Sequence, residues 1–205
     1  MGALTTKWFD YGEDAVRHLQ QADPALGAAM TRMGRVERTV IPDLFAALVH
    51  AIVGQLISAK AADTVWRRLQ ERCKDISPER VAGLSADEIQ QCGLTMKKAV
   101  CIHTIARMIA GDEFRLDELY ALPDREVIRR LTMLDGVGAW TAEMLLLNSM
   151  ERSDIVSWGD MAIRRGMMKL YGLEKLTREQ FEQYRLRYSP YGSVASIYLW
   201  QISFE

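Results

Sequence analysis

The stretch that decides the fold is Leu131–Arg165, with the sequence LTMLDGVGAWTAEMLLLNSMERSDIVSWGDMAIRR. Its first half indicates the end of a helix, a tight turn and the start of a second helix. Glycine at positions 136 and 138 lets the chain reverse where a Cβ would clash, and leaves backbone N–H groups able to approach an anion. The second half ends in a lone carboxylate, Asp160, before an apolar-periodic segment over 161–170. This order indicates a protein that holds a nucleic-acid backbone and acts on something nearby.

Composition favours a mostly helical protein. Aliphatic residues, Ala, Met and charged helix formers dominate, and β-branched runs bounded by turns are few. The formal net charge of −1 excludes a polycation that binds nucleic acid by bulk charge, so DNA contacts must come from a local patch and from backbone amides. No apolar run approaches about 20 residues, and the N-terminus lacks the order of a signal peptide. We therefore expect no membrane span and a cytoplasmic, DNA-associated protein.

The cysteines and histidines do not form the patterns of a disulfide framework or a metal site. The three cysteines are scattered, odd in number and include no C-x-x-C pair; they are Cys73, Cys92 and Cys101. This usage predicts reduced cytosolic thiols and no four-cysteine iron–sulfur cluster. The three histidines, His18, His50 and His103, are too far apart for the ligand spacing of a zinc site.

Hydrophobic spacing and capping residues predict helices along the whole chain. The expected ranges are 13–21, 24–33, 44–57, 59–73, 78–83, 85–91, 96–110, 116–122, 123–133, 139–149, 160–171, 177–187 and 194–202. Ser58 is expected to cap the fourth helix, and Ser85 with Glu88 forms a capping-box pattern. Residues 1–12 are expected to be an arm on the body and 34–41 a connector. We see no domain linker and expect one domain over 1–205.

The turn motif resembles a known DNA-binding element. Leu134-Asp135-Gly136-Val137-Gly138, followed by Thr141-Ala142, is similar to the helix-hairpin-helix motif, here over about 123–149. By itself it could also be an ordinary turn between two helices that needs two glycines. With Asp160 downstream, the combination resembles the helix-hairpin-helix (HhH-GPD) DNA glycosylases of base-excision repair. That resemblance implies an all-α, two-lobed fold with a DNA-binding cleft between the lobes.

The resemblance also assigns the hairpin residues. It implies that Gly136, Val137, Gly138 and Thr141 grip DNA phosphates, while Asp160 faces the flipped-out nucleotide. It further implies a structural monovalent cation, K⁺ or Na⁺, on the backbone carbonyls of Thr132, Leu134 and Val137. No cofactor is expected for catalysis.

A second segment narrows the resemblance to one branch. Residues 52–58, IVGQLIS, are similar to the segment that enters the duplex in the alkyladenine branch, the 3-methyladenine DNA glycosylase II type. Leu56 would be the wedge that replaces the extruded base, with Gln55 contacting the opposite strand or the pocket and Ser58 beside it. An ordinary core leucine is the alternative. The resemblance runs over about 43–200, so we expect a minimal version without the N-terminal β-rich domain of the best-known bacterial member.

Aromatic and methionine side chains complete the implied base pocket. Trp140 stands where bifunctional members of the superfamily carry a nucleophilic Lys, and an indole cannot be that nucleophile. The resemblance therefore implies a monofunctional enzyme in which Trp140 stacks on a positively charged alkylated base. Trp200 matches a second pocket aromatic, although a buried helix face would also explain it. Met144 and Met161 stand where the bacterial relative has tyrosines, so the pocket should be less polar there.

Asp160 has a structural and a chemical interpretation. It can cap the helix that follows and pair with Arg164. Near a reacting sugar, its carboxylate would stabilise an oxocarbenium-like charge and orient or deprotonate the attacking water.

The expected function is a monofunctional glycosylase, acting as a monomer on double-stranded DNA, that removes 3-methyladenine and 7-methylguanine. A uracil- or hypoxanthine-directed glycosylase on the same fold, and a non-catalytic DNA-binding module, remain alternatives.

Overall fold

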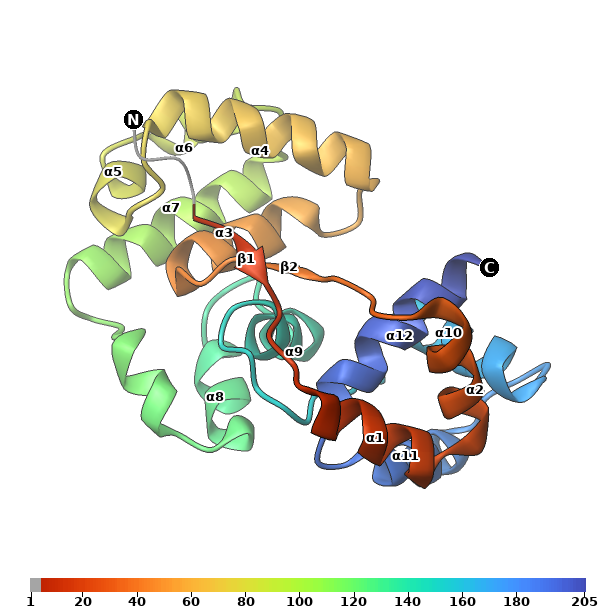
Figure 1. Ribbon diagram of the computed structural model, residues 1–205. Coiled ribbons are helices and arrows are strands. Elements are labelled where there is room, and N and C mark those ends of the chain that lie inside the picture. The colour runs from red at the N-terminus through yellow and green to blue at the C-terminus, as the bar shows by residue number, and fades with distance from the viewer. Residues whose placement is uncertain (1–4) are drawn as a thin grey trace. The chain divides into compact units, whose positions relative to one another are not determined.

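A computed structural model describes residues 5–205 of the chain (Figure 1). The described residues are mostly helical, as the composition predicts. They divide into two compact units. Of the described residues, the first contains 5–6 and 41–145, and the second contains 7–40 and 146–205. The prediction of a single glycosylase domain over 1–205 stays a prediction.

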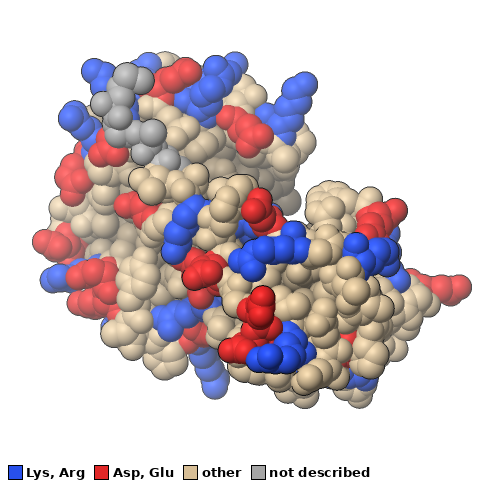
Figure 2. All heavy atoms as spheres, viewed as in Figure 1, with Lys and Arg blue, Asp and Glu red and all other residues tan. Residues whose placement is uncertain are grey.

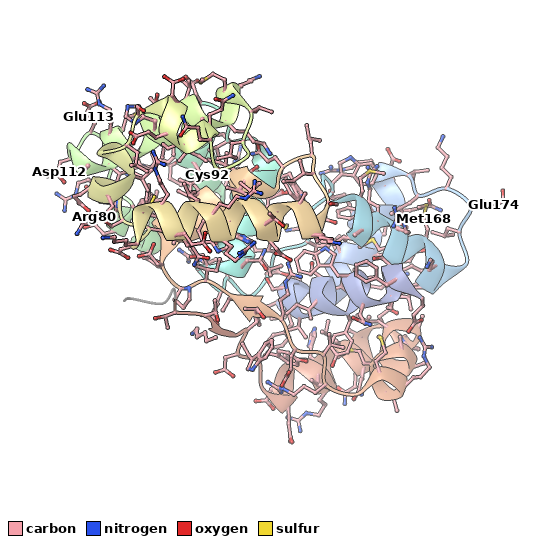
Figure 3. The ribbon with its side chains drawn as sticks, turned by 90° about the horizontal axis from the view of Figure 1, so that it is seen from above. Arg80, Cys92, Asp112, Glu113, Met168 and Glu174 are labelled. Atoms are coloured by element: carbon pink, nitrogen blue, oxygen red, sulfur yellow. The ribbon has the colours of Figure 1, made fainter. Side chains whose placement is uncertain are left out.

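The first unit is built around α3 (Leu44–Gly54) and α7 (Met96–Ala110). Its other elements are α4 (Ala59–Cys73), α5 (Pro78–Ala82), α6 (Ala86–Gln90), the 3₁₀ helix η1 (Asp117–Ala121), α8 (Asp124–Leu131) and the first part of α9 (Ala139–Asn148). Helix α3 is apolar on nearly every face because it contacts both α4 and α7, while α7 also contacts α5 and α6 (Figure 1). Asp112 and Glu113 stand at the outer edge of this unit, after the end of α7 (Figure 3).

The second unit packs the helices of the C-terminal half with those near the N-terminus. It contains β1 (Lys7–Trp8), α1 (Glu13–Ala22), α2 (Pro24–Met33), β2 (Thr39–Val40), α10 (Met161–Tyr171), α11 (Arg178–Tyr188) and α12 (Gly192–Phe204). Helix α10 packs closely on α12 at Gly166, where a Cβ would come 2.1 Å from the carbonyl oxygen of Leu199. Since no side chain fits at that distance, glycine sets the separation of these two helices.

Local signals placed most helix boundaries correctly. The predicted ranges 24–33, 59–73 and 96–110 match α2, α4 and α7, and the Ser85–Glu88 capping box is present. The predictions for α3 and α8 were too long at the end: α3 stops at Gly54 and not at residue 57, because the chain turns sharply there, and α8 stops at Leu131 and not at residue 133. Helix α12 is longer at both ends than predicted.

The predicted arm and connector also needed correction. Residues 7–8 and 39–40 pair as two short antiparallel strands, with Lys7 opposite Val40 and Trp8 opposite Thr39. Residues 1–4 of the predicted arm lie outside the described residues. Strands of two residues are too short to produce an alternating pattern that a sequence reading can detect.

Surface charge agrees with the near-neutral composition. Basic and acidic side chains are interspersed on the face that Figure 2 shows, without a large region of one sign. Over residues 5–205, none of the helices combines the length and apolar content that a membrane crossing requires.

Candidate functional site

The predicted hairpin is present as a short turn between α8 and α9. Two apolar residues, Leu134 and Val137, are buried and anchor the turn in the core of the first unit. The N–H of Val137 donates to the carbonyl of Leu134 at 3.1 Å, which closes the turn. The N–H of Ala142 donates to the carbonyl of Gly138 at 3.0 Å, which begins α9. The start of a helix presents N–H groups that have no acceptor within the helix, so this turn offers the chemistry of an anion site.

The two glycines of the turn have different roles, although the sequence suggested the same role for both. Gly136 has φ +78°, and a Cβ there would lie 2.7 Å from the sulfur of Cys101. The thiol of Cys101 donates to the carbonyl of Asp135 at 2.7 Å, so it fills the space beneath the turn. A Cβ at Gly138, by contrast, would meet nothing within 4 Å. The prediction that a Cβ would clash is confirmed at Gly136 and wrong at Gly138, where the missing side chain leaves open space outside the turn.

The turn between α3 and α4 presents Leu56 to solvent. Its side chain is fully exposed, and its backbone has φ +57°. This left-handed conformation costs a bulky residue roughly 1–2 kcal/mol. Such strain persists only where the surroundings hold it in place. The alternative of a core leucine is therefore wrong, and the exposed side chain is compatible with the predicted wedge. Ser58 caps α4 by accepting the N–H of Ala61 at 3.3 Å, as predicted.

Gln55 joins this turn to the hairpin. Its Nε2 donates to the carbonyl of Gly136 and to the hydroxyl of Thr141, both at 3.0 Å. The Thr141 side chain is buried, so its hydroxyl serves this internal contact. The structure thus brings together predicted residues from two segments far apart in the chain. The sequence suggested that Gln55 would face DNA or the pocket and did not reveal this internal role.

Trp140 and Met144 lie on α9 in the first unit, with different exposure. The indole of Trp140 is 36% exposed, whereas Met144 is buried. Trp140 therefore retains surface on which a planar group can stack. Met144 contributes to the apolar interior.

Asp160 caps α10 in the second unit. One carboxylate oxygen, Oδ1, accepts the N–H of Ala162 at 2.9 Å and the N–H of Ile163 at 3.0 Å. The predicted capping role is confirmed. The positive end of the helix dipole favours a negative charge at this position. Because the cap uses Oδ1, the Oδ2 atom lies outside it, and the side chain as a whole is buried.

Arg38 is a neighbour of Asp160 that the sequence analysis missed. Its guanidinium lies 4.2 Å from the ring centre of Trp200, and its Nε donates to the side-chain oxygen of Asn148 at 3.1 Å. The pKa of Arg38 is lowered, because the effect of burial is larger than the opposing effect of the negative charge of Asp160. Trp200 is itself buried and is held face-on by this cation. No local pattern marks Arg38, because its partners lie far along the chain.

Other residues near Asp160 have mostly structural partners. Met161 is largely exposed at the start of α10. The guanidinium of Arg164 lies 4.8 Å from the ring centre of Trp158. Lys169 donates to the carbonyl of Ser203 at 3.1 Å. These two basic residues therefore pack within the second unit.

The hairpin offers a donor set that fits a monovalent cation. Leu134 and Val137 fix the backbone here through their buried side chains, and the carbonyl of Leu134 accepts one N–H while retaining a second lone pair. Rings of neutral backbone carbonyls are the ligands that K⁺ uses in proteins. Together with the carbonyl of Thr132, which follows α8, these groups suit K⁺ or Na⁺ better than a divalent ion, because none of the three is charged.

Comparison with known proteins places this arrangement in a family. Residues 49–190 match the model of the HhH-GPD superfamily of base excision DNA repair proteins. The chain belongs to this superfamily. The matched range contains the turn after α3, the hairpin and Asp160.

Individual relatives agree with the family match. DNA-3-methyladenine glycosylase 1 of Schizosaccharomyces pombe is 30% identical over 76% of this chain and 71% of its own length. A solved DNA-3-methyladenine glycosidase from Bacillus halodurans is 28% identical, with a TM-score of 0.81 over 97% of this chain and 92% of that one. An S. pombe 3-methyladenine DNA glycosylase in complex with abasic DNA is 26% identical, with a TM-score of 0.82 over 92% and 95%.

Proposed function

We propose that the chain is a monofunctional DNA glycosylase that hydrolyses the N-glycosidic bond of alkylated purines, with 3-methyladenine and 7-methylguanine as substrates. The observation that carries the proposal is Leu56, an aliphatic side chain presented fully to solvent in a strained conformation next to a phosphate-binding type of turn. A glycosylase needs such a wedge, because an apolar side chain fills the gap in the duplex that the extruded base leaves. The names of the relatives support alkylated purines as the substrate class.

In this proposal the first unit binds the damaged strand. The N–H groups at the start of α9 and the open surface at Gly138 receive a phosphate, because a Cβ at Gly138 would point into otherwise empty space. Leu56 enters the duplex and replaces the stacking that the extruded base loses. Trp140 stacks on the extruded base through its exposed face, and the positive charge of an alkylated purine strengthens this contact by roughly 0.5–2 kcal/mol.

Asp160 supports the chemical step. The bond between C1′ and the base nitrogen breaks, its electron pair leaves with the cationic purine, and the base departs neutral. Water adds to C1′ and its proton passes to Asp160 or to solvent. The carboxylate stabilises the positive sugar of the transition state, and the cap formed with Ala162 and Ile163 holds it in one orientation. Since Trp140 replaces a nucleophilic Lys, no covalent intermediate forms and the DNA backbone stays intact.

A monovalent cation on the carbonyls of Thr132, Leu134 and Val137 would have a structural role in this scheme. It would add positive charge beside the phosphate and stiffen the turn. The reaction itself does not require it. We further propose that the chain acts as a monomer on duplex DNA.

The test is single-turnover base release from four duplexes that carry 3-methyladenine, 7-methylguanine, hypoxanthine or uracil, with the strands analysed before and after alkali. Release of the two alkylated purines, with strand breaks only after alkali, is the expected result. Release of uracil alone would keep the mechanism and overturn the substrate. Binding without release from any duplex would favour a non-catalytic DNA-binding module.

A further inference from the structure

Lys98, on α7, contacts the turn that carries Leu56. Its Nζ donates to the carbonyl of Val53 at 2.9 Å and to the carbonyl of Gln55 at 2.6 Å. The first carbonyl belongs to the last turn of α3, and the second immediately precedes Leu56. Two charge-assisted hydrogen bonds thus reach the backbone at the point where the helix stops and the chain reverses.

The end of α3 explains why a cation lies there. The last carbonyls of a helix have no partner within it, and the C-terminal end carries a partial negative charge. Helix α3 ends at Gly54 and α4 begins at Ala59, so the chain reverses within a few residues. The amine of Lys98 satisfies two carbonyls at once, although its partial burial opposes the charge and lowers its pKa.

We propose that Lys98 is a positioning residue that holds Leu56 in its exposed, left-handed conformation for entry into DNA. This proposal rests on the proposed glycosylase function. Leu56 cannot hold φ +57° by its own preference, so the neighbouring backbone must fix it. Lys98 fixes that backbone at the peptide that joins Gln55 to Leu56.

Gln55 provides the second point of attachment. Its backbone carbonyl is bound by Lys98, and its side chain is bound to Gly136 and Thr141 of the hairpin. The residue before the wedge is thus held from α7 on one side and from the hairpin on the other. This arrangement keeps the wedge at a fixed distance from the turn that receives the phosphate. Lys98 therefore acts on the reaction through Leu56 and needs no contact with DNA.

The neighbouring Lys97 provides a matched control. It lies on the same helix and carries the same charge, but its side chain is exposed. Lys97→Met and Lys98→Met both remove one positive charge from α7. Only Lys98→Met removes the two bonds to the turn. Any difference between the two variants therefore reports on those bonds and not on the net charge that attracts DNA.

The experiment measures single-turnover release of 7-methylguanine by Lys97→Met, Lys98→Met, Lys98→Arg and Leu56→Ala, and by the double variant Lys98→Met/Leu56→Ala. Base extrusion is followed in parallel by the fluorescence of 2-aminopurine next to the lesion. A displacement of about 1 Å can cost roughly a hundredfold in rate, so we expect Lys98→Met to slow extrusion and release at least about tenfold. Lys98→Arg should restore most of the rate, because it retains the charge and can donate to both carbonyls.

The double variant separates positioning from general stability. If Lys98 acts through Leu56, Lys98→Met causes no further loss once Leu56 is alanine. Additive losses, or equal rates for Lys98→Met and Lys97→Met, would overturn the role of Lys98 and leave the glycosylase proposal intact. Absence of release by the wild-type protein would overturn both. If Lys98→Met melts below the assay temperature, Lys98→Gln replaces it, and a rate equal to that of Lys97→Met again refutes the proposal.

Discussion

The hairpin glycines lead to opposite predictions for stability and for DNA binding. Gly136→Ala places a Cβ on a residue at φ +78° and 2.7 Å from the sulfur of Cys101. The left-handed backbone costs roughly 1–2 kcal/mol, and the overpacking adds roughly 1–3 kcal/mol. We therefore expect the free energy of unfolding to fall by about 2–5 kcal/mol. Gly138→Ala meets nothing within 4 Å, so its stability should stay within about 1 kcal/mol of the wild type.

Urea titration and duplex binding together test this pair. Gly138→Ala should weaken binding about tenfold, because its methyl group occupies the space where the phosphate approaches, and hydrogen bonds to a charged group contribute about 1.5–3 kcal/mol each. Combining Gly136→Ala with Cys101→Ala should recover the overpacking part of the loss and leave the backbone part. Equal stability of Gly136→Ala and Gly138→Ala would refute the distinction, as would unchanged DNA binding by Gly138→Ala.

Three further predictions concern the wedge, the base pocket and the thiols. Leu56→Gly should leave the free energy of unfolding unchanged or raise it by up to about 1 kcal/mol, since glycine adopts φ +57° freely. The same variant should release the base more slowly, and a lower stability in urea would contradict the prediction. Trp140→Leu should lower the single-turnover rate for cationic 7-methylguanine about two- to thirtyfold more than the rate for neutral hypoxanthine. Equal losses for the two bases would contradict a cation–π contact between Trp140 and the base. Burial raises the pKa of Cys73 and of Cys101 from about 9 to about 11. The free energy of unfolding that the two protonated thiols contribute is therefore complete below pH 9 and is lost as the pH rises through 11. The urea midpoint should fall between pH 9 and pH 11.

Sequence reasoning succeeded where the signal was local. Ser58 and Asp160 bind backbone groups within three residues of themselves, so their capping roles can be predicted from the order of residues alone. The same holds for the capping box at Ser85 and for the turn that needs Gly136. The resemblance of the hairpin to a known motif then directed attention to Leu56 and Trp140.

Sequence reasoning failed where a residue's partner lies far along the chain. The apolar run after Leu44 predicted a helix to residue 57, but α3 ends at Gly54. A run of apolar residues does not show which of them are exposed, and the turn is held by Lys98, which lies on a different helix. Arg38 lies in a segment interpreted as a connector, yet it stacks on Trp200. Gly138 looked equivalent to Gly136, and only the structure shows that Gly136 alone has a positive φ and faces the sulfur of Cys101.

The measurement that tests the central claim most directly compares Asp160→Asn with the wild type in single-turnover release of 3-methyladenine and in binding to the same duplex. Asparagine is as good a helix cap as aspartate, so α10 should keep its start while the carboxylate charge disappears. We predict that release is abolished and that duplex binding stays within a few-fold of the wild type. Release by Asp160→Asn at the wild-type rate would contradict the account.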